Sequence, residues 1–150
     1  MEENSLVFVK PRNEERALEV VHYLDGKLGF AFSRTILRQI RGIPEQIMRE
    51  HYRNIQGFSF YEATIEAFLR GTIFLTAYSG ENIVSRVRTI IGPTDPVVAK
   101  RTAPESIRAI FANDSLEVAR RERRYLNNVI HSSENVEEAR REIDLWKDFL

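Results

Sequence analysis

Thr72-Ile73-Phe74-Leu75-Thr76-Ala77-Tyr78 is the stretch on which the fold prediction depends. Most of its side chains are β-branched or aromatic, which is typical of a buried strand. A helical pattern over residues 61–69 precedes it and ends at Gly71. A second helical pattern over residues 81–91 follows it and ends at Gly92-Pro93. The centre of the chain is therefore predicted to be a strand between two helices.

The flanking sequence repeats this alternation. Strands are predicted at residues 6–9, 30–37 and 126–130, and helices at residues 14–24, 43–52, 105–111 and 136–149. Asn13 is expected to cap the first of these helices, which Asp25-Gly26 should end. The stretch from Pro93 to Pro104 is expected to be mostly loop. This order predicts an α/β (α+β) fold, a ferredoxin-like four-stranded antiparallel sheet with surrounding helices in a single domain over residues 1–150.

Composition excludes several classes of protein. Lys plus Arg and Asp plus Glu both number 22, and the zero net charge argues against a generally basic surface for nucleic acid or anionic membranes. A local positive cleft is still compatible with this sum. Without cysteine there can be no disulfide, thiol catalysis or Cys-based zinc site. The chain has only three histidines, and a multi-histidine metal site would need nearly all of them, so such a site is not predicted. No apolar run approaches 18 residues and no basic leader is visible, so a cytoplasmic protein is expected.

His131 is the first candidate for chemistry. It follows an apolar strand in Asn128-Val129-Ile130-His131-Ser132-Ser133. Glu142 comes eleven residues later on the predicted last helix, from which it could point back at the end of the strand. A carboxylate that fixes the ring and its tautomer is what a histidine nucleophile or base requires.

Cations at strand and helix ends are the second candidate feature. Lys10 ends the first strand, Arg88 lies near the end of a helix, and Arg108 follows the long loop. Thr94, in the turn Gly92-Pro93-Thr94-Asp95-Pro96, adds a hydroxyl. Such groups could converge on one anion, as phosphoryl transfer requires. Since no glycine-rich phosphate loop is present, side chains would have to form the site.

Taken together, these motifs resemble the nucleoside diphosphate kinase family in order and spacing over nearly the whole chain. The matching segments are residues 6–11, 50–52, 80–84, 88, 91–96, 103–108, 128–133 and 139–146. The resemblance implies a ping-pong phosphotransferase, in which His131 takes the γ-phosphate of a nucleoside triphosphate and passes it to a nucleoside diphosphate. It also implies Mg²⁺ carried by the nucleotide, with no metal ligand from protein side chains.

The resemblance assigns roles to the matched positions. Glu142 and Ser133 correspond to the groups that orient the imidazole. Asn128 and Lys10 correspond to ribose contacts, and Phe60 to the ring on which the base stacks. The positions that correspond to phosphate ligands are Lys10, Tyr52, Arg88, Thr94 and Arg108. The implied partners are ATP and nucleoside diphosphates, together with other copies of the chain in a hexamer, tetramer or dimer.

Besides single-residue departures, such as Arg12 after Lys10-Pro11 and Ser132 after His131, the chain departs from the family pattern in length at two places. About ten extra residues lie between Arg108 and Asn128, around Asp114 to Leu126, and the usual C-terminal tail after the last helix is missing. An alternative is therefore a catalytically weak family member that binds nucleotide or a partner. The extra segment carries Arg120, Arg121, Arg123 and Arg124. These arginines are either a solvated helical face or a contact for phosphate or a partner, with nucleic acid the weaker idea.

Overall fold

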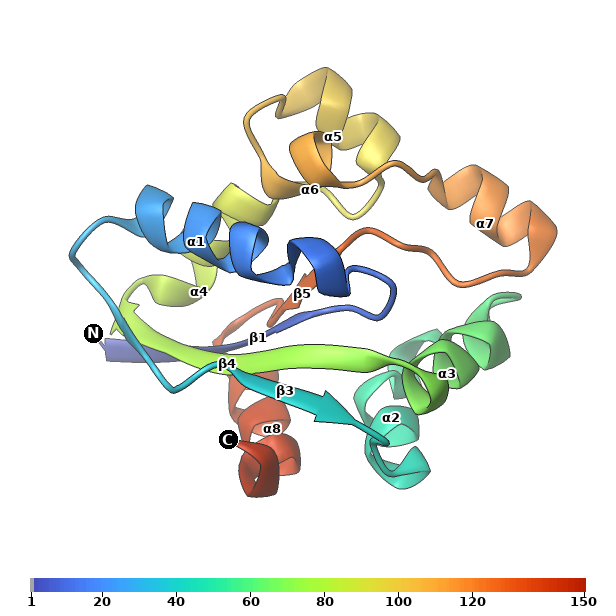
Figure 1. Ribbon diagram of the computed structural model, residues 1–150, viewed down its shortest axis with the longest axis horizontal. Helices are drawn as coiled ribbons and strands as arrows, with labels where there is room; N and C mark the ends of the chain where they lie inside the picture. The colour runs from blue at the N-terminus through green and yellow to red at the C-terminus, as the bar shows by residue number, and fades with distance from the viewer. Residues whose placement is uncertain (1) are drawn as a thin grey trace.

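The computed structural model describes residues 2–150 (Figure 1). Its strands are β1 (Glu2–Val9), β2 (Ser33–Arg34), β3 (Arg38–Arg41), β4 (Thr72–Glu81) and β5 (Ile130–Ser132). Its α-helices are α1 (Ala17–Leu28), α2 (Glu45–His51), α3 (Tyr61–Arg70), α4 (Ile83–Ile91), α5 (Pro96–Thr102), α6 (Ile107–Phe111), α7 (Leu116–Glu122) and α8 (Val136–Trp146). Short 3₁₀ turns are η1 (Glu14–Arg16), η2 (Arg53–Ile55) and η3 (Lys147–Phe149).

The sheet has the predicted antiparallel, ferredoxin-like arrangement. Its order is β2-β4-β1-β5, and β3 also pairs with β4, on a second stretch of that strand. The second predicted strand, over residues 30–37, is thus wrong in its bounds, because only Ser33–Arg34 (β2) of that range is a strand and β3 begins after it, at Arg38. Phe30 and Ile36, expected on its buried face, are instead 104% and 78% exposed. In this segment Phe32 and Leu37 pack against the core instead.

Two apolar cores lie on opposite faces of the sheet. Successive side chains of a strand point to opposite faces, and β1 follows this rule. Leu6 and Phe8 join a core with α2, α3 and α8, whereas Val7 and Val9 join a core with α1 and α4. Figure 1 shows the same division, with α1 and α4 on one side of the sheet and α8 and α2 on the other. β1 is therefore buried on both faces, and its end at Lys10 is rigidly placed.

Two further expectations at helix ends are wrong. The first long helix continues through Gly26 to Leu28, with its apolar face packed on the core. Asn13 makes no capping hydrogen bond. Its amide nitrogen donates instead to the carbonyl oxygens of Lys10 and Pro11 and to Asn127 Oδ1. Asn13 therefore ties the loop after β1 to the segment that leads into β5.

The proline-rich stretch 93–104 contains a helix, α5, where a loop was expected. The Asp95 carboxylate accepts a hydrogen bond from Val97 N, and Pro96 occupies the first turn. An Asp cap followed by proline is a common way to begin a helix. The Asp cap and the proline in the first turn therefore explain why this stretch is helical, although its high proline content favours a loop.

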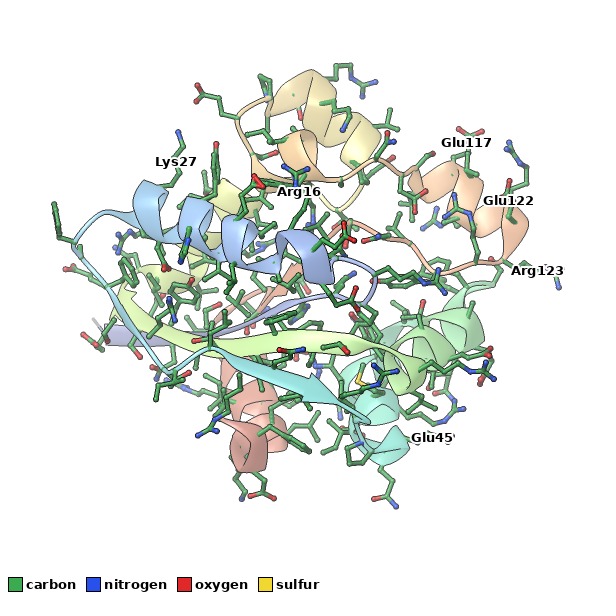
Figure 2. The ribbon with its side chains drawn as sticks, in the orientation of Figure 1. Arg16, Lys27, Glu45, Glu117, Glu122 and Arg123 are labelled. Carbon is green, nitrogen blue, oxygen red and sulfur yellow. The ribbon has the colours of Figure 1, made fainter. Side chains whose placement is uncertain are left out.

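The extra segment before β5 folds into α7 and is closed by Asp114. The Asp114 carboxylate accepts two hydrogen bonds from the Arg124 guanidinium and one from the backbone N–H of Asn127. Burial alone would raise the pKa of Asp114, but these hydrogen bonds lower it below its ordinary value. Figure 2 shows Glu122 and Arg123 at the outer end of α7, pointing away from the sheet. The arginines of this segment are thus divided between a structural ion pair and a solvated end.

Among residues 2–150, none of the helices combines the length and the apolar character needed to cross a membrane.

Candidate active site

His131 lies within β5, opposite Phe8 of β1. Its ring stacks on the Phe8 ring, with centroids 4.7 Å apart and planes 20° from parallel. The side chain is 17% exposed. Because β1 is buried on both faces, this stacking fixes the imidazole at the rim of the core with one edge open.

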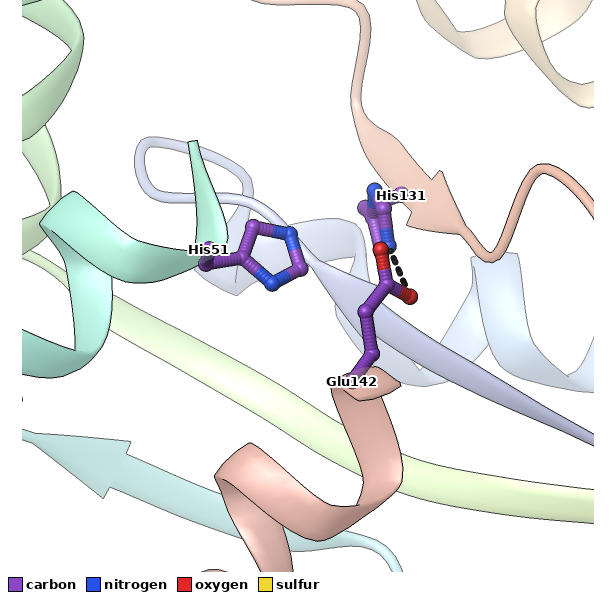
Figure 3. A group of neighbouring side chains, drawn as sticks. All are labelled: His51, His131 and Glu142. Carbon is purple, nitrogen blue, oxygen red and sulfur yellow. Dashed lines mark hydrogen bonds and ion pairs between the residues drawn. The ribbon is translucent and has the colours of Figure 1, made fainter. Parts of the chain in front are cut away.

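Glu142 of α8 holds the imidazole of His131. His131 Nε2 lies 3.0 Å from Glu142 Oε1, and the Ser133 hydroxyl donates to the same oxygen at 2.7 Å. Ser133 Oγ in turn accepts from the backbone N–H of Leu6. Burial would raise the pKa of Glu142, but His131 and the hydroxyl of Ser133 lower it to about 2. The carboxylate is therefore ionised and accepts the Nε2 proton, which leaves the lone pair on Nδ1. Figure 3 shows the second ring nitrogen on the side away from Glu142.

A strained turn immediately before His131 sets its position. Val129 has φ of 76°, and Ile130 N donates to Asn128 O at 2.9 Å across it. Such a γ-turn is rare for a β-branched residue. It begins the short strand β5 at Ile130, later than the expected strand over residues 126–130. Lys10 N donates to Val129 O at 2.8 Å, so the turn is bound to the end of β1. Strain of this kind often accompanies a functional site.

Arg108 of α6 holds the same turn from the other side. Its guanidinium donates to Asn128 O, Ile130 O and Gly92 O, at 3.3, 2.7 and 3.0 Å. Gly92 has φ of 92°, and a Cβ there would lie 2.5 Å from Ser106 Oγ, so only glycine fits. Burial lowers the pKa of Arg108 to about 10; Tyr52 opposes this shift, and the charge of Arg88 adds a smaller lowering effect. The guanidinium thus remains a cation beside His131.

Lys10 and Arg88 complete a group of uncompensated cations. Among residues 2–150, no carboxylate forms an ion pair with Lys10, Arg88 or Arg108. Burial, together with the charge of Arg108, lowers the pKa of Lys10 to about 7. Charges that repel one another in a partly buried site are stabilised by an anion. The site is therefore arranged to bind a negatively charged ligand.

One cavity, of about 580 Å³, joins these groups. This volume lies within the range of small-molecule sites. The predicted residues that line it are Lys10, Tyr52, Arg88, Thr94, Arg108, Asn128, His131 and Glu142. Tyr52 Oη and Asn128 Oδ1 are buried and have no hydrogen-bond partner within residues 2–150. Since unpaired buried polar atoms are costly, both are suited to bond a ligand.

Phe60 is placed differently from the other predicted residues. It precedes α3, is 8% exposed and does not line the cavity. Its ring stacks on Phe58, with centroids 5.6 Å apart. Phe58 is 47% exposed and has the Arg120 guanidinium of α7 5.5 Å from its centroid. Phe58 therefore covers Phe60 and presents the more accessible ring.

Sequence reasoning missed several residues of the cavity, namely His51, Asn54, Ile55, Glu134, Glu138 and Arg141. Arg141 donates to Glu138 and to the carbonyl oxygens of Glu50 and His51. It thereby joins α8 to the end of α2. A signal for His51 was available, because it directly precedes Tyr52 and is one of only three histidines in the chain.

His51, His131 and Glu142 also form a cluster with the residue types of a metal site, their ligand atoms lying within 4.8 Å of one another (Figure 3). Trp146 Nε1 donates to His51 Nδ1 at 3.0 Å. An indole nitrogen can only donate, so the single proton of the His51 ring is on Nε2, the nitrogen that would have to bind the metal. The donor chemistry of this cluster does not fit a metal ion.

Comparison with known proteins shows to which family the chain is related. The family model described as nucleoside diphosphate kinase matches residues 3–148. A nucleoside diphosphate kinase of Streptomyces avermitilis is 31% identical over 97% of this chain and 96% of its own length. A thioredoxin domain-containing protein 3 homolog of Ciona intestinalis is 33% identical over 94% of this chain, which spans only 19% of that protein.

A solved structure is also similar. It is a transition-state mimic of nucleoside-diphosphate kinase from Borrelia burgdorferi with bound vanadate and ADP, with a TM-score of 0.82 and 25% identity. The match covers 97% of this chain and 86% of that one.

The fold, together with a histidine–carboxylate pair inside a cationic cavity, defines a nucleotide phosphotransferase. More specifically, the chain belongs to the nucleoside diphosphate kinase family.

Proposed function

We propose that this protein transfers the γ-phosphoryl group of a nucleoside triphosphate to a nucleoside diphosphate through a phosphohistidine at His131. The observation that carries the proposal is the bond between Glu142 and His131 Nε2, which leaves Nδ1 as a nucleophile in a cavity lined by unpaired cations. The Nδ1 lone pair attacks the γ-phosphorus, an N–P bond forms, and the P–O bond to the leaving diphosphate breaks. The second half-reaction reverses these steps on a different diphosphate.

Charge neutralisation and positioning are the main tasks of a phosphotransferase site. In our proposal Lys10, Arg88 and Arg108 neutralise the phosphates, while the hydroxyls of Thr94 and Tyr52 bond to them. Asn128, with its free Oδ1, and Lys10 contact the ribose. The carboxylate of Glu142, oriented by Ser133, stabilises the positive charge that the ring gains on phosphorylation.

Mg²⁺ is proposed as a companion of the nucleotide. Bound there, it would neutralise phosphate charge and supply Lewis-acid assistance. No protein ligand is required for the steps above.

For the base, Phe60 is the position that the family pattern assigns. Since Phe58 covers Phe60, we propose that the base stacks at this Phe58–Phe60 pair. Stacking on an aromatic face discriminates weakly among bases, so several diphosphates should be accepted.

The test uses the two half-reactions separately. Incubation with Mg²⁺ and ATP labelled in the γ-phosphate should leave an acid-labile, alkali-stable label on the protein. Addition of unlabelled GDP should then move that label into GTP. If the protein binds ATP but never carries the label, the catalytically weak alternative replaces this proposal. The covered Phe60 is the observation that favours that alternative.

A pH effect is expected from Lys10. Its pKa of about 7 means that the charged form, which attracts phosphate, predominates only below that pH. We expect kcat/KM to fall as pH rises through about 7, by as much as about tenfold per unit. Lys10→Met should have a lower overall kcat/KM that no longer falls as pH rises. In Lys10→Arg the fall should occur at higher pH. An unaltered profile in Lys10→Met would contradict the assignment.

A homo-oligomer is also proposed. Phe30 and Ile36 are almost fully exposed beside β2, and Leu18 of α1 is 58% exposed. Phe30 and Ile36 flank the same short edge strand, and large exposed apolar side chains that lie together are typical of a protein interface. A second copy of the chain is the partner that we propose for them.

A further inference from the structure

His51 is a buried titratable group for which the proposed reaction has no role. It is the last residue of α2, is 3% exposed and lines the cavity. Aromatic rings enclose it, with centroids at 4.6 Å for His131, 4.7 Å for Tyr52, 5.3 Å for Phe8 and 5.7 Å for Trp146. Burying a polar ring in such a position costs free energy unless its nitrogens form hydrogen bonds.

One nitrogen of this ring is satisfied, and its partner determines the tautomer. His51 Nδ1 accepts from the indole N–H of Trp146 at 3.0 Å, so the ring proton lies on Nε2. The surroundings keep the ring uncharged. Burial lowers the pKa of His51 well below its ordinary value, assisted by His131, Arg141 and Lys10 and opposed by Glu142.

The other nitrogen faces the pair that carries the chemistry. Figure 3 shows the His51 ring nitrogen that is not bound by Trp146 turned toward Glu142 and His131. One ligand atom of each of the three residues lies within 4.8 Å of those of the other two. Glu142 Oε1 already accepts from His131 and from Ser133, whereas Oε2 has no donor among residues 2–150. A donor and an acceptor without partners among the described residues therefore belong to one compact cluster.

From this arrangement we propose that His51 is a positioning residue, which donates from Nε2–H to Glu142 Oε2, directly or through one water, and so holds that carboxylate against His131 while His131 carries a phosphoryl group. The inference deepens the proposed function and depends on it.

An uncharged donor suits this task. The carboxylate must stay ionised and fixed while the His131 ring gains positive charge. A second donor restricts its rotation and disfavours its protonation. A cationic donor would compete with His131 for the same charge. Arg141, the nearest alternative, donates elsewhere, to Glu138 and to the carbonyl oxygens of Glu50 and His51.

Two substitutions separate this role from structural support of Trp146. In His51→Gln the side-chain amide reaches the position of Nε2 and keeps the donor toward Glu142. In His51→Asn the shorter amide reaches only the position of Nδ1, so it keeps the partner of Trp146 and loses that donor. We expect His51→Asn to slow phosphoenzyme formation about 10- to 100-fold with little change in nucleotide KM. His51→Gln should retain most of the rate, even if it has the lower Tm. His22→Gln and His22→Asn, on the exposed face of α1, are the matched controls.

The reverse order, with His51→Asn faster than His51→Gln, would overturn the proposal and assign His51 to the support of Trp146. Equal rates would overturn it as well. Long-range ¹H–¹⁵N spectra of the wild-type histidine rings give a test that needs no variant to fold. We expect the His51 proton on Nε2 and a change in that signal when His131 is phosphorylated. A proton on Nδ1, or no change on phosphorylation, contradicts the proposal. A wild type that is never labelled refutes the proposed function instead.

Discussion

His131→Gln is expected to abolish transfer of label from γ-labelled ATP to the protein and to lower the nucleotide exchange rate by on the order of 10⁴-fold or more. The reason is that, among residues 2–150, His131 has the ring nitrogen that its neighbours leave free in the cavity lined by the unpaired cations, whereas His51 Nδ1 accepts from Trp146. Glu142 Oε1 accepts from two donors, and one of them is the Ser133 hydroxyl. Tyr52 is held as the protonated phenol, since burial and Glu142 raise its pKa.

Glutamine is the better replacement because alanine would also disturb the fold. His131 packs on Phe8 and donates to a carboxylate that is only 6% exposed. Alanine would leave Glu142 ionised and short of a donor, a change that destabilises buried carboxylates. The amide of glutamine can replace that donor but cannot form the intermediate. The measurements are label incorporation and Tm, with His22→Gln as the control. A labelled His131→Gln protein would show that another residue is the nucleophile.

The order of strands and helices could be predicted because hydrophobic periodicity and helix stops are local. Gly71 and the strand after it are examples, and the structure places both as expected. The errors have physical causes. The segment around Phe30 and Ile36 alternates as a strand does, yet both of these side chains are exposed. The side chains of this segment that pack on the core are Phe32 and Leu37. The three prolines of residues 93–104 favour a loop, whereas the Asp95 cap that begins α5 is a single local signal.

The candidate site was predictable to a similar degree. Motif spacing brought His131, Glu142 and the cations together, and the structure places them around one cavity. What spacing could not supply is the arrangement of hydrogen bonds between distant segments. The indole of Trp146 fixes the tautomer of His51 across 95 positions of sequence. Likewise, the burial of Phe60 beneath Phe58 depends on how the α3 entry packs, which no local pattern encodes.

Arg88→Ala and Arg108→Ala should differ, although both remove a cation from the same cavity. Arg88 is exposed and its side chain has no hydrogen bond or ion pair within residues 2–150, so its loss should lower kcat/KM by about 10²-fold or more and leave Tm unchanged. Arg108 also satisfies three carbonyl oxygens around the strained turn at Val129. Its loss should lower both kcat/KM and Tm, the latter by about 5–10 °C.

Arg108→Lys separates the two roles of Arg108. Lysine keeps the charge, but a single ammonium group cannot reproduce a planar fork that reaches three carbonyls. We therefore expect Arg108→Lys to recover part of kcat/KM while its Tm stays close to that of Arg108→Ala. Steady-state kinetics with ATP and a diphosphate, and thermal unfolding of the same samples, measure both. If Arg88→Ala lost stability and kept its rate, the cavity would not be the phosphate site. Activity in this protein would then have to come from a different surface, because the unpaired cations beside His131 are what make phosphoryl transfer chemically reasonable there.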